Sequence, residues 1–156
     1  MTTMLIKEPA VVMRAGPAKT TDVAVSGHAA GPIGGAVTGL PRVWLRLEGL
    51  TGLAAGVAIY LAGGGSLLWI LPLFLAVDIS MVGYLGGPRL GAVLYDLAHN
   101  WAIGLAVLGA SVVLASTPLL LAGAILVAHV GLDRLAGYGL KYPTAFADTH
   151  LGSLRR

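Results

Sequence analysis

The sequence predicts an all-α protein, a four-helix transmembrane bundle with a flexible N-terminal tail. The first observation behind this prediction is composition, because 56% of the 156 residues are apolar and only 11% are charged. An average soluble domain has about 25% charged residues. The second observation is that the chain from Val43 onward divides into apolar segments, each close to the ~20 residues that cross a bilayer as a helix. Lipid offers no partners for backbone N–H and C=O groups, so the spans of so short a chain must be helices.

The N-terminal segment, residues 1–41, differs in composition from the rest of the chain. It is rich in Gly, Ala, Thr, Ser and Pro, and its apolar pieces are too short to span a bilayer. It also lacks the continuous apolar stretch of a signal peptide. We therefore expect a flexible cytoplasmic tail outside the folded unit.

The membrane domain is expected over residues 42–152, followed by a basic C-terminal end at 153–156. Ser66 stands where the N-cap of the second helix is expected, and Pro72 predicts a kink in that helix. The fourth helix begins with the triplet Ser116-Thr117-Pro118, an N-cap followed by a proline in the first turn. The four helices are expected at about 43–62, 67–84, 90–115 and 117–137.

Basic residues gather at one end of the predicted bundle. The loops at the opposite end, residues 63–66 and 111–117, carry no charge. The positive-inside rule therefore places both termini and the Arg89 turn in the cytoplasm, in a multi-pass protein of the inner (cytoplasmic) membrane. The basic residues are Arg42, Arg46, Arg89, Arg134, Lys141, Arg155 and Arg156.

Every predicted helix carries at least one ionisable residue inside its apolar region, where such groups are costly and indicate function by default. Counted from the cytoplasmic helix ends, these residues lie at nearly one level, roughly 6 to 14 Å deep. Asp96 and His99 are three residues apart, and His129 and Asp133 are four apart, so each pair shares a helix face. The full set is Glu48, Asp78, Asp96, His99, His129 and Asp133.

The four carboxylates of this layer need compensation, because burying an unpaired carboxylate costs several kcal/mol. Glu48 precedes Gly52 and Gly56 in four-residue steps, which predicts that it faces into the bundle. The buried negative charge can be compensated in three ways. Some acids stay protonated, arginines at the rim fold back, or a bound cation supplies the positive charge. The arginines at the rim are Arg46, Arg89 and Arg134.

Two histidines and several carboxylates on facing helices resemble the ligand set of dimetal helix bundles and suit zinc, iron or manganese. Those sites use Glu-x-x-His pairs, whereas this chain has Asp-x-x-His and His-x-x-x-Asp. A structural hydrogen-bond network and a proton- or ion-conducting path are the alternatives. The expected ligands of a divalent metal are Glu48, Asp78, His99, His129 and Asp133, with Tyr84, Tyr95, Asp96 and His150 around them.

The stretch after the fourth helix has two interpretations. As an interfacial anchor it would hold Tyr138 and Tyr142 at headgroup level, with Lys141 facing lipid phosphates. Alternatively, Asp148 and His150 fold back over the mouth of the bundle and add ligands.

Several motifs occur in order between residues 43 and 152, and together they resemble a family of small four-helix bacterial membrane proteins known only as a domain of unknown function. The resemblance implies the four-helix membrane fold and brings no activity, substrate or cofactor. The family pattern has Tyr-Asn where this chain has Tyr95-Asp96, which favours His99 over Asp96 as a ligand. The motifs are LRLEG (45–49), DISMVGYLGGPRLGAVLYDLAH (78–99), AHVGLDRLAGYGLKY (128–142) and THLG (149–152).

The sequence also excludes several function classes. A chain without cysteine has no disulfide scaffold, thiolate metal site or cysteine nucleophile. Phosphate-loop and dinucleotide motifs are absent from the sequence, as is a basic–aromatic patch, so nucleic acid is not an expected partner. Three classes remain: a metal-dependent membrane enzyme acting on a lipid or small molecule, a proton- or ion-handling protein, and an accessory subunit of a larger membrane complex. The lipid bilayer is the expected partner, and homo-oligomerisation is left open.

The one-sided basic residues make a topology prediction that cysteine labelling can test, since the chain has no cysteine of its own. Single cysteines in place of Ser66 and Thr117 should react in intact cells with a membrane-impermeant maleimide. A cysteine in place of Ser153 should react only after the membrane is opened. Labelling at position 153 in intact cells would reverse the topology.

Overall fold

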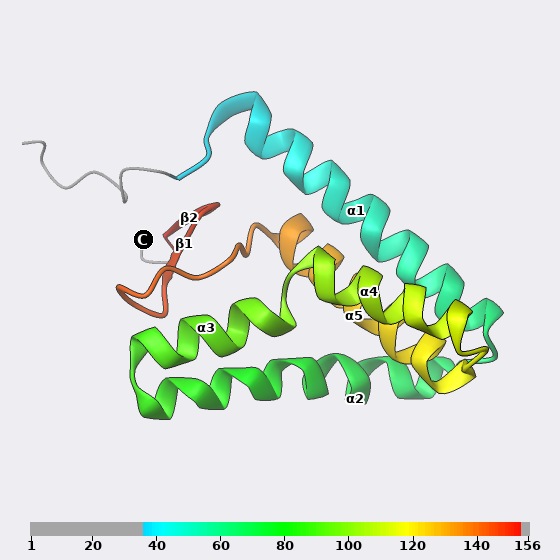
Figure 1. Ribbon diagram of the computed structural model, residues 1–156. Coiled ribbons are helices and arrows are strands. Elements are labelled where there is room, and N and C mark those ends of the chain that lie inside the picture. The colour runs from blue at the N-terminus through cyan, green and yellow to red at the C-terminus, as the bar shows by residue number, and fades with distance from the viewer. Residues whose placement is uncertain (1–35, 154–156) are drawn as a thin grey trace, which may run out of the picture.

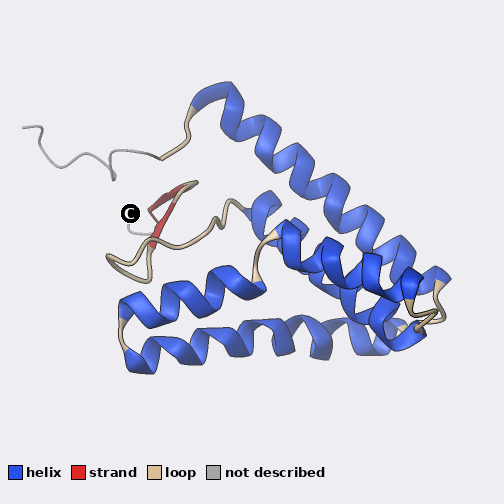
Figure 2. Cartoon of the chain, in the orientation of Figure 1, coloured by secondary structure: helices blue, strands red, loops and turns tan. Residues whose placement is uncertain are grey.

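The computed structural model describes residues 36–153, which form an all-α bundle with a short hairpin at one end (Figures 1 and 2). Four helical spans in this part of the chain are long and apolar enough to cross a membrane: Gly39–Ala62, Leu67–Gly86, Pro88–Val113 and Thr117–Ala136. The predicted fold class is confirmed. The elements are α1 (Gly39–Ala62), α2 (Leu67–Asp78), the 3₁₀ helix η1 (Ile79–Gly86), α3 (Pro88–Ala98), α4 (Trp101–Val113), α5 (Thr117–Ala136), β1 (Asp148–Thr149) and β2 (Gly152–Ser153).

The first helix begins earlier than its sequence indicated. α1 starts at Gly39 and includes Pro41, which the sequence assigned to the tail. Proline is tolerated in the first turn of a helix because the N–H that it lacks would have no intrahelical partner there. The tail predicted for residues 1–41 is therefore wrong for its last three residues, and its first 35 lie outside the described residues.

The second span changes its helical geometry near its end. The Ser66 side chain accepts a hydrogen bond from the Leu68 N–H at 3.3 Å, as expected of an N-cap. α2 continues through Pro72 to Asp78, and the chain then tightens into η1. The departure from α-helical geometry thus comes at Ile79 and not at the proline.

The third span is divided, although its sequence predicted one continuous helix over about 90–115. The Asn100 side chain donates to the carbonyl oxygens of Asp96 and Leu97 at 2.6 and 3.1 Å, and it accepts from the Ile103 N–H at 3.0 Å. One side chain therefore ends α3 and caps α4, in the way that asparagine competes with backbone hydrogen bonds. α3 runs beside the second span, whereas α4 lies against α5 (Figure 1).

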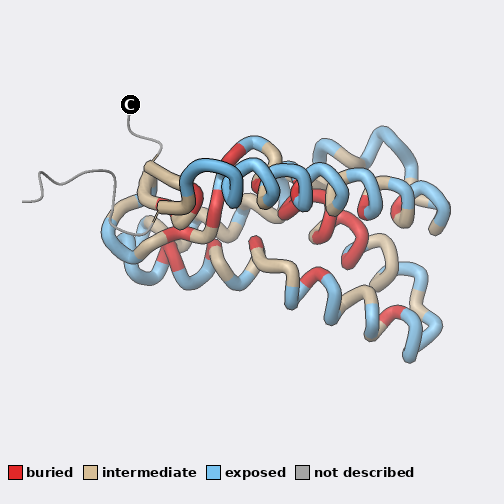
Figure 3. The backbone as a smooth tube through the Cα atoms, turned by 90° about the horizontal axis from the view of Figure 1, so that it is seen from above, coloured by how far each residue is buried: buried red, intermediate tan, exposed pale blue. Residues whose placement is uncertain are grey.

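α5 is the central helix, in contact with α1, α4 and α2. It holds most of the buried helical residues, whereas the outer helices have long exposed stretches (Figure 3). Small residues bring α5 close to α1, because a Cβ added at Gly49 would lie 2.8 Å from the Gly131 carbonyl oxygen. Such contacts are typical of membrane helices, whose association depends on close van der Waals packing.

The chain after α5 folds back over the end of the bundle. β1 and β2 pair antiparallel, with Asp148 opposite Ser153, and a single bridge joins Lys141 to Thr149. The His150 backbone donates to the Leu140 carbonyl oxygen at 3.1 Å and accepts from the Val37 N–H at 2.9 Å. This segment therefore joins the start of α1 to the end of α5 (Figure 2).

The close approach of α1 and α5 predicts a large cost for a single methyl group at Gly56. A Cβ there would lie 2.5 Å from the Ala128 nitrogen and 2.6 Å from the Ala124 carbonyl oxygen, both backbone atoms. Gly56→Ala should destabilise the protein by about 1–3 kcal/mol because the helices must separate. Gly109→Ala is the matched control, since a Cβ at that helical glycine meets nothing within 4 Å. Thermal unfolding in detergent measures both variants, and equal unfolding temperatures would contradict the packing role.

Candidate functional site

Three of the predicted site residues meet inside the bundle, each from a different span. Asp78 ends α2, His99 lies at the break between α3 and α4, and His129 is on α5. The Nε2 atoms of the two histidines are 3.1 Å apart. Asp78 Oδ1 lies 3.3 Å from His99 Nε2 and 3.5 Å from His129 Nε2. Both histidines are buried, with 2% and 3% of their surface exposed.

The orientation of His99 is fixed by its other ring nitrogen. Its Nδ1 lies 2.9 Å from the Tyr95 carbonyl oxygen, which can only accept, so Nδ1 carries a proton. A neutral His99 therefore presents the Nε2 lone pair to His129 and Asp78. The Tyr95 ring stacks on the imidazole with centroids 3.7 Å apart, which further restricts its rotation.

Asp133 adds a second carboxylate to the group. Its oxygens lie 3.9 Å from His99 Nε2 and 4.0 Å from His129 Nε2, and Oδ2 accepts a 2.6 Å hydrogen bond from the Tyr95 hydroxyl. Tyr95 thus contacts both Asp133 and His99. We call Asp78, His99, His129 and Asp133 the His–Asp cluster.

The rim arginines form no direct ion pair with the cluster. Arg46 donates to the Leu135 carbonyl oxygen at 2.7 Å, Arg89 is exposed, and Arg134 points to His150 with its Nη1 2.8 Å from Nε2. Within residues 36–153, the ion pairs of the cluster join only histidine and aspartate. No arginine therefore pairs directly with the carboxylates of the cluster, although Arg134 lies within electrostatic range of Asp133.

Glu48 lies outside the cluster, against the expectation from its spacing. It is exposed, and no hydrogen bond or ion pair in the described part of the chain joins it to the other four residues. The reason is the break in the third span. Trp101, at the start of α4, covers Gly52, but α3 turns away from α1 (Figure 1), and Glu48 on the preceding turn stays exposed.

Asp96 and Lys141 are joined at the base of the C-terminal segment. Asp96 Oδ1 accepts a 2.7 Å hydrogen bond from the Lys141 backbone N–H. The Lys141 side chain is buried, with Nζ donating to the Phe146 carbonyl oxygen at 2.9 Å. The expectation that Lys141 faces lipid phosphates at the surface is therefore wrong. Burial lowers its pKa, and the Asp133 and Asp96 carboxylates oppose that shift.

His150 and Tyr84 lie near the cluster residues without joining them. The Leu140 N–H donates to His150 Nδ1 at 2.9 Å, and the Arg134 guanidinium faces the same ring. Burial and this guanidinium lower the pKa of His150, because both disfavour the imidazolium. The Tyr84 ring packs edge-on against Phe146 at 5.1 Å, and its buried hydroxyl has no partner among the described residues.

A cavity of about 290 Å³ adjoins the cluster. Its wall includes both carboxylates, Asp78 and Asp133, together with Lys141. Phe146 and Tyr138 also line it and are 47% and 43% exposed, so the cavity reaches the surface beside the C-terminal segment. Sequence reasoning missed Lys141 as a residue of this site, because only the return of the chain over the bundle places it there.

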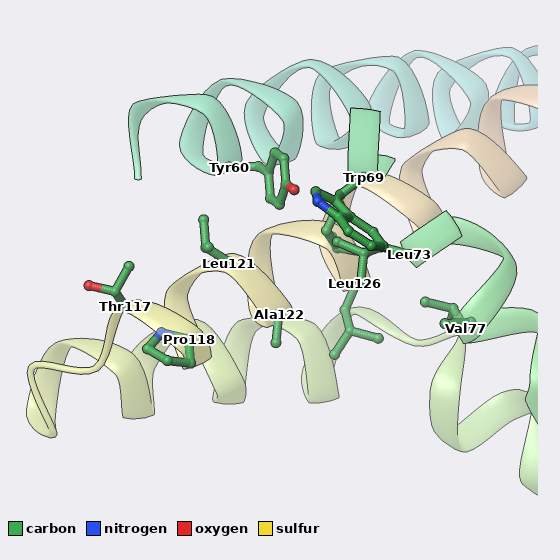
Figure 4. A pocket seen from close by; sticks show the side chains of 11 residues that line it. Tyr60, Trp69, Leu73, Val77, Thr117, Pro118, Leu121, Ala122 and Leu126 are labelled. Carbon is green, nitrogen blue, oxygen red and sulfur yellow. The ribbon is translucent and has the colours of Figure 1, made fainter. Parts of the chain in front are cut away.

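A larger cavity, about 780 Å³, lies toward the other end of the bundle. It is bordered by α2 and α5 and closed at one side by Tyr60 of α1 (Figure 4). Its lining is almost entirely apolar and holds no carboxylate or histidine, as expected of a surface that contacts lipid chains. Of these two cavities, only the smaller one is lined by carboxylates and an ammonium group.

Comparisons with known proteins give a family and no activity. The model of a family described as Domain of unknown function (DUF4260) matches residues 42–154, a range that includes the whole His–Asp cluster and Lys141. No curated protein and no solved structure matches the chain.

The contact between Asp96 and the Lys141 N–H predicts different results for two substitutions. Asp96→Asn should keep the protein within about 1 kcal/mol of the wild-type stability, because an amide oxygen can still accept this hydrogen bond. Asp96→Ala should cost about 1–3 kcal/mol, since the backbone N–H of a buried residue loses its partner. Thermal unfolding in detergent compares the two variants. An equal loss in both would show that the charge, and not the hydrogen bond, matters.

Proposed function

The chain belongs to the DUF4260 family, and from its geometry we propose a metal-dependent integral membrane enzyme that acts on a lipid or small molecule at the membrane surface. In this proposal Asp78, His99, His129 and Asp133 hold one divalent cation. The chemistry takes place in the adjoining cavity of about 290 Å³.

The observation that carries the proposal is the 3.1 Å distance between the two histidine Nε2 atoms. Two imidazole nitrogens bound to one tetrahedral zinc at 2.0–2.1 Å are about 3.3 Å apart, which is close to this spacing. Asp78 Oδ1 lies at a comparable distance from both nitrogens, and the three ligand atoms lie within 4.8 Å of one another. This spacing supports a cation held by these three atoms.

The arrangement of hydrogen-bond acceptors supports a bound cation. Asp78 Oδ1, the carboxylate of Asp133 and the Nε2 lone pair of His99 are all acceptors directed at one region, and no lysine or arginine among residues 36–153 forms an ion pair with them. A divalent cation would satisfy these groups together. Two imidazoles and two carboxylates suit zinc, iron or manganese.

Outer contacts support the same interpretation for two of the four ligands, whereas the buried Nδ1 of His129 has no hydrogen-bond partner among the described residues. Metal-binding histidines almost always donate their second ring N–H to a carbonyl or carboxylate, and ligating carboxylates are themselves hydrogen-bonded. His99 Nδ1 faces the Tyr95 carbonyl oxygen, and Asp133 accepts from the Tyr95 hydroxyl. Tyr95 would thus orient two of the four ligands.

The cavity is what favours an enzyme over a purely structural metal site. Asp78 and Asp133 line it directly, so a cation held by them would be accessible to water and substrate. Such a cation would supply Lewis-acid chemistry, either polarising a phosphoryl or carbonyl oxygen or activating a water molecule. The cavity reaches the surface at an end of the apolar spans, where a lipid headgroup or a soluble molecule can enter.

Elemental analysis of detergent-purified protein tests the metal site. The wild type should contain about one zinc, iron or manganese ion per chain. His99→Ala and His129→Ala should lose the metal and unfold at a lower temperature, because metal binding contributes directly to folding.

Glu48→Gln is the matched control, since Glu48 is exposed and outside the cluster. It should retain both the metal and the wild-type unfolding temperature. A wild-type protein that is fully stable, free of metal and unable to bind added zinc, iron or manganese would exclude the proposal. The accessory and proton- or ion-handling functions would then be favoured.

A further inference from the structure

The cavity beside the His–Asp cluster contains a buried cation, Lys141. This residue is 6% exposed, and within residues 36–153 its ammonium group forms no ion pair with a carboxylate. An ammonium group has three N–H donors, and here one is used by the Phe146 carbonyl oxygen at 2.9 Å. A buried ammonium with donors to spare, on the wall of an open cavity, is arranged to receive an anionic ligand.

The position of Lys141 is fixed by contacts on several sides. Its Nζ lies 4.0 Å from the ring centroid of Phe146 and 5.0 Å from that of Tyr95, so both aromatic faces stabilise the charge. Its backbone is held by Asp96 Oδ1 and by the bridge to Thr149. Because these contacts hold the side chain in place, little side-chain entropy would be lost when an anion binds.

The formal charges around the cavity predict when an anion can enter. Its lining includes two carboxylates, Asp78 and Asp133, and one ammonium, Lys141, and therefore carries one net negative charge when the histidines are neutral. A divalent cation on the cluster changes this sum to one net positive charge. An anion is therefore repelled from the metal-free cavity and attracted to the metal-bound one.

We propose that Lys141 and the metal together form a subsite for a phosphate or phosphoryl group, so that the substrate is a phosphate-bearing molecule. This inference rests on the proposed metal site. A tetrahedral phosphoryl group has several oxygens, so one can bind the metal while another accepts from the ammonium group. Lysine is a standard point-charge binder of phosphate, and metal ions polarise phosphoryl oxygens. The exposed rings of Phe146 and Tyr138 at the mouth would contact the remainder of the molecule.

Binding of inorganic phosphate to the metal-loaded, detergent-purified protein tests the subsite. Isothermal titration calorimetry should detect binding to the wild type and none to protein stripped of metal. Lys141→Met removes the charge and keeps an apolar side chain of similar length, and it should weaken phosphate binding by about tenfold or more, the loss of one charge-assisted hydrogen bond. Arg89→Gln is the control, because it removes an exposed positive charge outside the cavity. It should bind phosphate as the wild type does.

A competition experiment distinguishes the two sources of such a group. Short-chain phosphatidic acid should displace inorganic phosphate at a lower concentration than glycerol phosphate does if the substrate is a lipid. The reverse order identifies a water-soluble phosphate compound. Failure of both to compete would contradict a phosphoryl subsite.

The outcomes separate the two proposals. A wild type that takes up no metal contradicts the metal site and, with it, the subsite. A wild type and a Lys141→Met variant that bind metal and phosphate equally contradict the subsite alone.

If Lys141→Met fails to fold, a second measurement on the native lysine replaces it. In a Lys7→Arg, Lys19→Arg chain Lys141 is the only lysine. Solid-state NMR of this ¹⁵N-lysine-labelled, phosphate-loaded protein should show a ³¹P–¹⁵Nζ dipolar coupling. The absence of that coupling overturns the proposal.

Discussion

The close contact between α1 and α5 is the constraint from which the rest of the structure follows. Gly49 and Gly131 bring the two backbones together, and α5 is thereby fixed in rotation as well as in position. A helix turns by about 100° per residue, so His129 and Asp133, each two residues from Gly131, lie on the opposite side of α5. The glycine contact with α1 therefore directs the two site residues of α5 toward the second and third spans. Packing on one face of this helix therefore determines which residues lie on the other.

The break at Asn100 is the second decisive feature, because it lets the two halves of the third span pack against different helices. α4 can pack against α5 while α3 follows η1, and His99 lies at the point where the two directions diverge. The first residue after a helix is free of helical geometry, so His99 can present Nδ1 to the Tyr95 carbonyl oxygen while Nε2 faces His129. The same divergence leaves Glu48 exposed. One local feature thus both completes the His–Asp cluster and removes a carboxylate from it.

The C-terminal segment forms part of the wall of the cavity that adjoins the His–Asp cluster. Its return over the bundle places Lys141 and Phe146 on the cavity wall, and Asp96 holds the Lys141 backbone from below. Asp96 therefore acts on the segment and not on the cluster, although it shares a helix with His99. Arg134 also serves this segment, because its guanidinium faces His150. Asp96 and Arg134 thus both stabilise the segment that covers the cluster.

The sequence by itself determined the four apolar spans, the Ser66 cap and most of the polar groups that meet between the helices. These follow from local rules: a span needs about 20 apolar residues, and a charged group in such a span must find a partner. Spacing alone could not determine the direction of Glu48, because helical periodicity relates residues on one helix and contains no information about where a neighbouring helix begins. The break at Asn100 has a residue-level cause, yet asparagine within an apolar segment does not by itself end a helix. The inward position of Lys141 depends on contacts with Asp96, Phe146 and Thr149, which are distant along the chain or on a non-periodic segment. Tertiary structure alone decided these points, because each depends on which segments meet in space.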